Sequence, residues 1–338
     1  MSRRFRALLV GIAATLATAP AFAEPTLWQR VEHPHARAEA KLLASLERML
    51  DDASRGAVLE IGLDRELARA AVVMIELSGL SEPSDPRLAC VEAQALVEAD
   101  IGREADARRL LEGALEGLPP GSRAARAWRL LTFALARQDE REAEYRAYSK
   151  VIELTWDPQV RANAFANRGD VAMLGRDLVG ARSDYEQAIG AGGDPEIVAL
   201  ARYGLAVAEE RLGDLPAAYA ALDKALALRL PVPPFSSEDP LDLPGVYFVP
   251  PYEENYIRAL RAMAVGRRAT DPGERRDAYE IAVAEWDTYL ARSAETEPFR
   301  ENARAHRARS ERELEKAMAV ERSAPARPSE PRRSPQNP

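Results

Sequence analysis

The sequence predicts an all-α protein made of stacked antiparallel helix pairs, and three observations favour this fold class. Of 338 residues only 6% are aromatic, whereas 46% are hydrophobic and 30% charged, with Ala, Leu, Glu and Arg abundant, which is typical of helices. Apolar residues recur at three- and four-residue spacing along most of the chain, the period of an amphipathic helix. A pattern of small, apolar and aromatic residues also repeats every 37 residues in the middle of the chain, as in a solenoid.

The first 23 residues resemble a secretory signal peptide. Three arginines open the segment, an apolar stretch follows over residues 7–19, and a small-x-small pattern ends at Ala23. We therefore expect cleavage between Ala23 and Glu24 and export to the periplasm or the medium. This apolar stretch is too short to span a bilayer comfortably, so no transmembrane anchor is expected after cleavage. A mature chain that avoids cysteine fits export to an oxidising compartment, and the single Cys90 is expected to be a small hydrophobe on a helix.

Residues 24–87 are expected to form a degenerate N-terminal helix pair. Apolar residues recur at helical spacing over residues 35–53 and again over residues 64–78. The segment from Ser81 to Pro86 contains two prolines, so we expect a loop there before the first clear repeat.

Four units of one pattern fill residues 88–231, and each starts 37 residues after the one before. The starts are Leu88, Ala125, Ala162 and Ala199. The third unit shows the pattern most clearly, with a first helix, a turn at Gly175 and a second helix. Its residues at the repeated positions are, in chain order, Phe165, Gly169, Ala181, Tyr185, Ala188 and Ile189. Small residues let two helices cross closely, and bulky side chains such as these rings and Trp128 fill the space between neighbouring helices.

Prolines and two exceptions mark the limits of the pattern. A proline follows each second helix at about the same place and is expected to stop the unit: Pro120, Pro158, Pro195 and Pro231. Glu144 stands at a small position of the second unit, and Arg202 at the large position of the fourth. Either these helices shift by one residue, so that Ala143 and Tyr203 take the two positions, or the contacts there are loose.

This spacing resembles the tetratricopeptide repeat (TPR), a family of paired helices whose usual unit has about 34 residues. The resemblance covers residues 88–231 and implies a right-handed TPR-type α-solenoid of antiparallel helix pairs, because one pair cannot bury its apolar stripe alone. It also implies a concave groove that binds a peptide or a helix. Four positions of each first helix face the groove in this family. Here they place six candidate partner-binding residues: Arg126, Arg129, Phe133, Asn163, Asn167 and Tyr203.

The side chains at these positions suit a protein ligand. Asn163 and Asn167 are four residues apart and share a helix face, and an amide both donates to and accepts from a peptide backbone. Arg126 and Arg129 are three apart and suit a carboxylate. The lysines with which some TPR domains clamp a C-terminal carboxylate are absent, so that specificity is not implied. The alternative is that these positions are ordinary solvated polar sites.

Three C-terminal segments interrupt and close the array. Residues 232–252 form a Pro-rich acidic insert with an apolar run over Val246–Val249, which either packs over the array or holds a partner. Residues 253–321 are expected to form a C-terminal helix pair and a highly charged, solvent-facing capping helix. Residues 322–338 are rich in Pro and Arg and are expected to be a disordered tail.

The charge balance and the missing motifs argue against several function classes. The formal net charge is −8, and removing the +3 carried by each of the signal segment and the tail leaves −14 on the helical body. Such a body does not attract nucleic acid. No phosphate-binding, nucleophile-elbow, dinucleotide or zinc-protease motif occurs. His33 and His35 lack a third ligand, and His306 is expected to be exposed, so we expect no metal, no cofactor and no catalytic residue.

The sequence therefore predicts an exported, non-catalytic scaffold in the periplasm of a Gram-negative bacterium, which binds a protein or peptide in its groove. A structural cell-envelope protein that self-associates, or that binds cell wall, is the first alternative. An enzyme or an enzyme subunit is the second.

Overall fold

The computed structural model of the chain describes residues 38–46, 61–78, 85–228, 240–242, 246 and 248–323. The expected signal peptide, the pair His33 and His35, residues 324–338 of the expected tail and most of the Pro-rich insert lie outside these ranges. Within them the regular secondary structure is helical, with no strand. The chain divides into two compact units, one up to Val171 and one from Ala172 onward.

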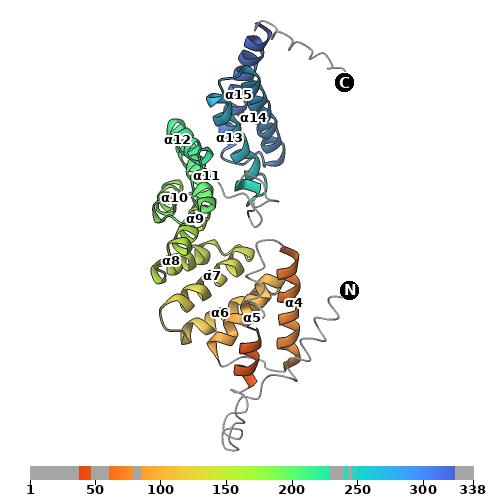
Figure 1. Cartoon of the computed structure of the whole chain (residues 1–338), viewed down its shortest axis with the longest axis vertical. Helices are drawn as coiled ribbons and strands as arrows, with labels where there is room; N and C mark the ends of the chain where they lie inside the picture. The colour runs from red at the N-terminus through yellow and green to blue at the C-terminus, as the bar shows by residue number, and fades with distance from the viewer. Residues whose placement is uncertain are drawn as a thin grey trace, which may run out of the picture. The chain divides into compact units, whose positions relative to one another are not determined.

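The first unit consists of successive helices joined mostly by short turns (Figure 1). They are a helix over residues 38–46, α4 (Ile61–Ser78), α5 (Pro86–Ala99), α6 (Glu104–Gly117), α7 (Ser122–Arg137), α8 (Arg141–Leu154) and α9 (Pro158–Leu174), whose last three residues belong to the second unit. From α4 to α8 each helix packs on the next, and α5 also contacts α7. The first helices of two successive repeats therefore lie side by side.

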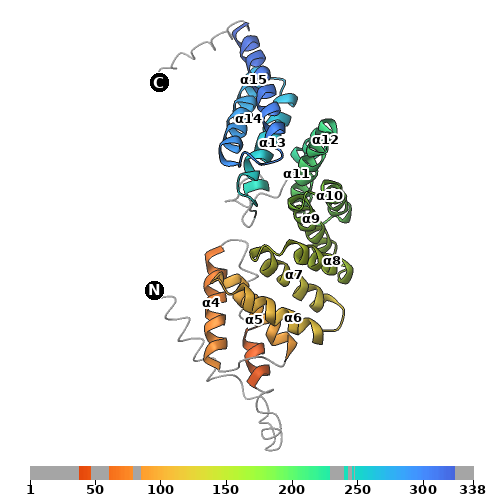
Figure 2. The ribbon, with the colours of Figure 1, turned by 180° about the vertical axis from the view of Figure 1, so that it is seen from behind.

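The second unit contains the second helix of the third repeat, the fourth repeat and a C-terminal bundle. Its helices are α10 (Leu178–Ala191), α11 (Pro195–Arg211), α12 (Leu215–Leu226), the short 3-10 helix η1 (Pro240–Asp242), α13 (Glu253–Arg268), α14 (Pro272–Arg292) and α15 (Arg300–Ser323). The helix α11 packs on both α10 and α12. Figure 2 shows α13, α14 and α15 side by side, and α14 packs closely on both of its neighbours.

The turn inside each repeat has the same backbone conformation at the same place. A residue with positive φ occurs at Gly102 (76°), Asp139 (59°), Arg176 (65°) and Gly213 (91°), each 37 residues after the one before. These turns recur with the 37-residue spacing of the sequence pattern, and the fold is an all-α solenoid of TPR-type helix pairs. In the third unit the left-handed conformation falls on Arg176 and not on Gly175, the glycine expected at the turn.

The helix starts also follow the repeat. Pro158 and Pro195 are the first residues of α9 and α11, a position where a fixed φ and a missing N–H are tolerated. The prolines expected to stop one unit therefore start the next. Asp177 and Asp214, again 37 residues apart, cap α10 and α12, and each carboxylate accepts the backbone N–H three residues on at 2.9 Å.

The core uses the predicted small and large positions. Small residues at the helix crossings are buried, among them Ala181, Ala188, Ala218 and Ala225. The rings of Tyr148, Phe165 and Tyr185 are buried as well, and Trp128 packs against both core clusters of the first unit. A Cβ at Gly204 would lie 2.4 Å from the ring of Tyr185, so α10 and α11 approach too closely there for any side chain.

The two exceptions in the pattern have different outcomes. In the second unit Glu144 is 8% exposed while Ala143 is only half-buried, so the helix does not shift and the carboxyl takes the buried position. In the fourth unit Tyr203 is buried and Arg202 half-buried, so the large buried position there moves from Arg202 to Tyr203.

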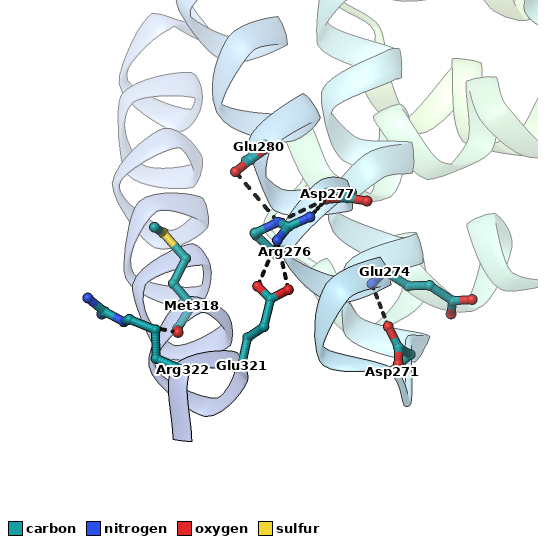
Figure 3. Close-up of polar contacts among 8 residues, drawn as sticks. All are labelled: Asp271, Glu274, Arg276, Asp277, Glu280, Met318, Glu321 and Arg322. Atoms are coloured by element: carbon teal, nitrogen blue, oxygen red, sulfur yellow. Dashed lines mark hydrogen bonds and ion pairs between the residues drawn. The ribbon is translucent and has the colours of Figure 1, made fainter. Parts of the chain in front are cut away.

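The last helix, α15, is more than the solvent-facing cap that its charge suggests. One face is buried, at Arg300, Ala303, Ser310 and Ala317. The helix continues to Ser323, so the first two residues of the expected tail are helical. Arg276 of α14 holds its last turn: the guanidinium binds Glu321 at 2.7 Å and also contacts Asp277 and Glu280 (Figure 3).

Candidate functional site

Three of the predicted groove residues form an exposed stripe on α7. Arg126, Arg129 and Phe133 are spaced by three and four residues and lie on one side of the helix. Phe133 is 36% exposed, a large value for a ring within a helical array. Arg126 Nη2 donates to Oε1 of the buried Gln94 on α5 at 2.9 Å. This bond holds the guanidinium of Arg126 between α5 and α7, the first helices of two successive repeats. The helix carries four arginines and no acidic residue, although the body is acidic.

Two further predicted residues pair on α9. Asn167 Nδ2 donates to Asn163 Oδ1 at 3.0 Å, and both side chains are half-buried. This bond leaves an amide donor on Asn163 and an amide acceptor on Asn167 for a ligand. No hydrogen bond or ion pair within the described residues joins this pair to the arginines of α7.

The sixth predicted residue, Tyr203, does not line an open groove. It is 2% exposed and belongs to the core cluster that also contains Leu241 of η1 and Tyr256 of α13. Four residues of α11 share this face, at spacings of three and four: Tyr203, Val207, Glu210 and Arg211. Tyr203 stands at a groove position of the repeat pattern, but the chain's own C-terminal helices cover it.

Glu210 is the centre of a buried polar cluster on that face. The Tyr256 hydroxyl donates to it at 2.5 Å, Asn302 Nδ2 donates at 3.0 Å, and His306 Nε2 lies 2.7 Å from Oε1. Burial opposes ionisation of Glu210, but the bonds from His306, Tyr256 and Asn302 outweigh it and hold the pKa of Glu210 below its ordinary value. The cluster ties α11 to both α13 and α15.

Arg211 forms a second contact beside this cluster. Its side chain is 4% exposed, and Nη2 binds Glu253 of α13 at 2.5 Å. The guanidinium also lies over two rings, 4.8 Å from the centroid of Tyr256 and 4.0 Å from that of Phe299. A buried arginine needs this compensation because an unpaired charge is costly away from water.

His306 is not exposed, contrary to the expectation from its arginine-rich helix. Its side chain is 12% exposed, and its ring stacks on Trp286 at 5.4 Å between centroids and 22° between planes. The sequence pattern also missed Glu210 and Arg211. They lie one turn beyond the groove positions considered on α11, so extending the same helix face by one turn would have found them.

Glu144 is an isolated buried carboxyl in the first unit. Burial raises its pKa to about 7, with Arg141 opposing the shift and Asp170 and Asp139 adding to it. In the described part of the chain, no three His, Cys, Asp or Glu side chains come together as metal ligands. No helix there combines the length and the apolar character needed to cross a membrane.

Comparisons with known proteins return structures only: neither a family model nor a curated protein matches the chain. BtubC (BKLC) from P. vanneervenii is 18% identical over 70% of this chain and 97% of its own, with a TM-score of 0.47. MamA is 22% identical over 48% of this chain and 88% of its own, with a TM-score of 0.41. The TPR domain of P58(IPK) is 13% identical over 93% of this chain and 76% of its own, with a TM-score of 0.33. Because these likenesses are weak, the TPR-type fold rests on the helix pairs and their regular turns, and function must come from the site.

Proposed function

We propose that this TPR-type chain is a non-catalytic protein-interaction scaffold of the cell envelope, which binds a peptide or helix on the exposed faces of α7 and α9. The observation that carries the proposal is the stripe of Arg126, Arg129 and Phe133 on α7. It presents two cations and a ring to solvent at positions that line the concave groove in TPR proteins. Location in the envelope rests on the signal-like N-terminal segment alone.

The chemistry of the two helices favours an extended acidic partner. Arg126 and Arg129 face no acidic side chain on their own helix, so a partner carboxylate is their natural counter-ion. Phe133 offers apolar contact on the next turn. The amide pair of α9 suits a peptide backbone, which needs both a donor and an acceptor.

The test is capture of partners from envelope extracts by the mature chain. We expect the double variant Asn163→Ala with Asn167→Ala, and separately Arg129→Ala, to lose proteins that the wild type retains, with unchanged thermal unfolding. Arg146→Ala is the matched control for Arg129, because Arg146 is a 71% exposed arginine on the second helix of the same repeat. An unchanged set of captured proteins from both groove variants would show that this face is ordinary solvated surface.

A further inference from the structure

The face of α11 that corresponds to the groove is covered by the chain itself. Tyr203, Val207 and Glu210 are each less than 5% exposed, although they follow one another along the face that would line a groove. The short helix η1 packs on α11, and its Leu241 is buried in the same cluster. The groove face of the fourth repeat is therefore already covered by the chain's own C-terminal helices, which take the place of a ligand.

The contacts between α11 and the C-terminal helices include several specific polar ones beside the apolar packing of Tyr203 and Val207. Glu210 takes donors from α13 and α15, and Arg211 takes the Glu253 carboxylate together with the faces of two rings. Glu210 and Arg211 thus each have a complement of opposite chemistry on the C-terminal bundle. This is how a ligand is recognised, with one carboxylate, one guanidinium and several oriented donors.

The C-terminal helices pack mainly on one another, within an apolar cluster that also includes residues of α11 and α12. Trp286, Tyr256 and Tyr289 meet edge to face, with centroids 4.8 to 6.4 Å apart. The helices α13 and α14, and likewise α14 and α15, pack along their lengths, whereas α13 contacts α11 and α12 only sparingly. The contact of α13 with α11 and α12 is therefore sparse, and it carries the buried polar groups of Glu210 and Arg211. A sparse contact with polar groups is typical of interfaces that open.

We propose that α13 and α15 act as an intramolecular ligand of the groove face of α11, and that a helix presenting a carboxylate and a tyrosine three residues apart can replace them. Glu253 and Tyr256 of α13 define this spacing, with Glu253 on Arg211 and Tyr256 touching both Arg211 and Glu210. The inference goes beyond the open face of α7 and α9 and does not depend on it, since it concerns other residues.

The experiment uses a fluorescent peptide of residues 248–268 as probe and the full mature chain as receptor. The variant Asn302→Ala with His306→Ala removes two α15 contacts to Glu210 and leaves every residue of α11 in place. We expect the peptide to bind this variant at least tenfold more tightly than the wild type. Adding Arg211→Ala to the variant should abolish the gain, and so should a peptide carrying Glu253→Gln and Tyr256→Phe.

Hydrogen exchange followed by mass spectrometry distinguishes release of the C-terminal helices from unfolding of the repeat that they cover. In the α15 variant we expect faster exchange in α13 and α15 while α11 and α12 keep their protection. Equal affinity for wild type and variant overturns the proposal, as does a gain that survives Arg211→Ala. Loss of protection in α11 and α12 together with the bundle also overturns it, because the C-terminal helices would then be an inseparable part of the repeat core.

Discussion

The carboxyl of Glu144 makes the stability of the first unit depend on pH. It occupies a position that the repeat otherwise gives to a small residue, and within the described residues its carboxylate takes no hydrogen bond. Burial therefore raises its pKa from an ordinary value of 4.5 to about 7. The folded chain keeps a proton that the unfolded chain releases between these two values. Stability must then fall as the pH rises through this window, and the contribution is fully present only below it.

Replacing this carboxyl by an amide should remove the dependence. We expect Glu144→Gln to be more stable than the wild type at pH 8, by up to about 3 kcal/mol, because a shift of this size corresponds to that difference between the two protonation states. At pH 5 the two proteins should differ much less. Urea unfolding followed by circular dichroism at both pH values measures the effect. Glu142→Gln is the control, since its side chain is 94% exposed. A stability difference that does not change with pH would mean that Glu144 stays ionised.

At the scale of the element, the turn between the two helices of a repeat requires a residue in the left-handed conformation, with positive φ. At the position that recurs every 37 residues, two of the four residues are glycines, which adopt positive φ without strain, and two are not. Arg176 is exposed, makes no ion pair within the described residues, and still holds a φ of 65°. A residue with a Cβ adopts this region at a cost of about 1 kcal/mol.

Removing a side chain from one such turn and adding one to another should change the stability of the chain in opposite directions. We expect Arg176→Gly to stabilise the chain by about 0.5 kcal/mol, since relief of strain exceeds the added entropy of the unfolded chain. Gly213→Ala should destabilise it by about 1 kcal/mol or more, because the φ of 91° there excludes a Cβ. Urea midpoints of the two variants against the wild type measure both changes. Destabilisation by Arg176→Gly would mean that the arginine side chain contributes more than its backbone strain costs.

The same turns show what the sequence could predict of the elements. The period and the pairing of helices follow from local chemistry, whereas Pro158 and Pro195, expected to end a unit, begin the next first helix. The position of the left-handed residue does not follow, because the glycine of the third unit, Gly175, precedes Arg176 by one residue. Hydrogen bonds at the end of α9 decide the matter: the Arg176 and Asp177 N–H groups bond back to carbonyls of that helix at 3.0 and 2.9 Å.

At the scale of the whole chain, sequence separation limits what a pattern can reveal. Asn163 and Asn167 share a helix, so their pairing was visible as a four-residue spacing. His306 and Glu210 are 96 residues apart, and nothing near either residue predicts that they meet. An arginine-rich helix such as α15 looks solvent-facing because its buried face is made partly of Arg300 and Ser310, which a hydropathy pattern counts as exposed.

The largest buried side chain tests how far this C-terminal bundle stands alone. Trp286 is fully buried, stacks on His306 and donates to the sulfur of Met263 at 3.4 Å, so Trp286→Ala should cost the bundle about 3–5 kcal/mol. Repeat proteins are stabilised mainly by contacts between neighbours, and stability need not be uniform along them. We therefore expect the amides of α13 to α15 to exchange much faster in this variant, measured by mass spectrometry, while those of α5 to α8 keep their protection. Trp156→Ala, at a tryptophan that is 88% exposed, should leave every helix unchanged. If α5 to α8 lose protection together with the bundle, the chain unfolds as one cooperative body and the two compact units are not independent in stability.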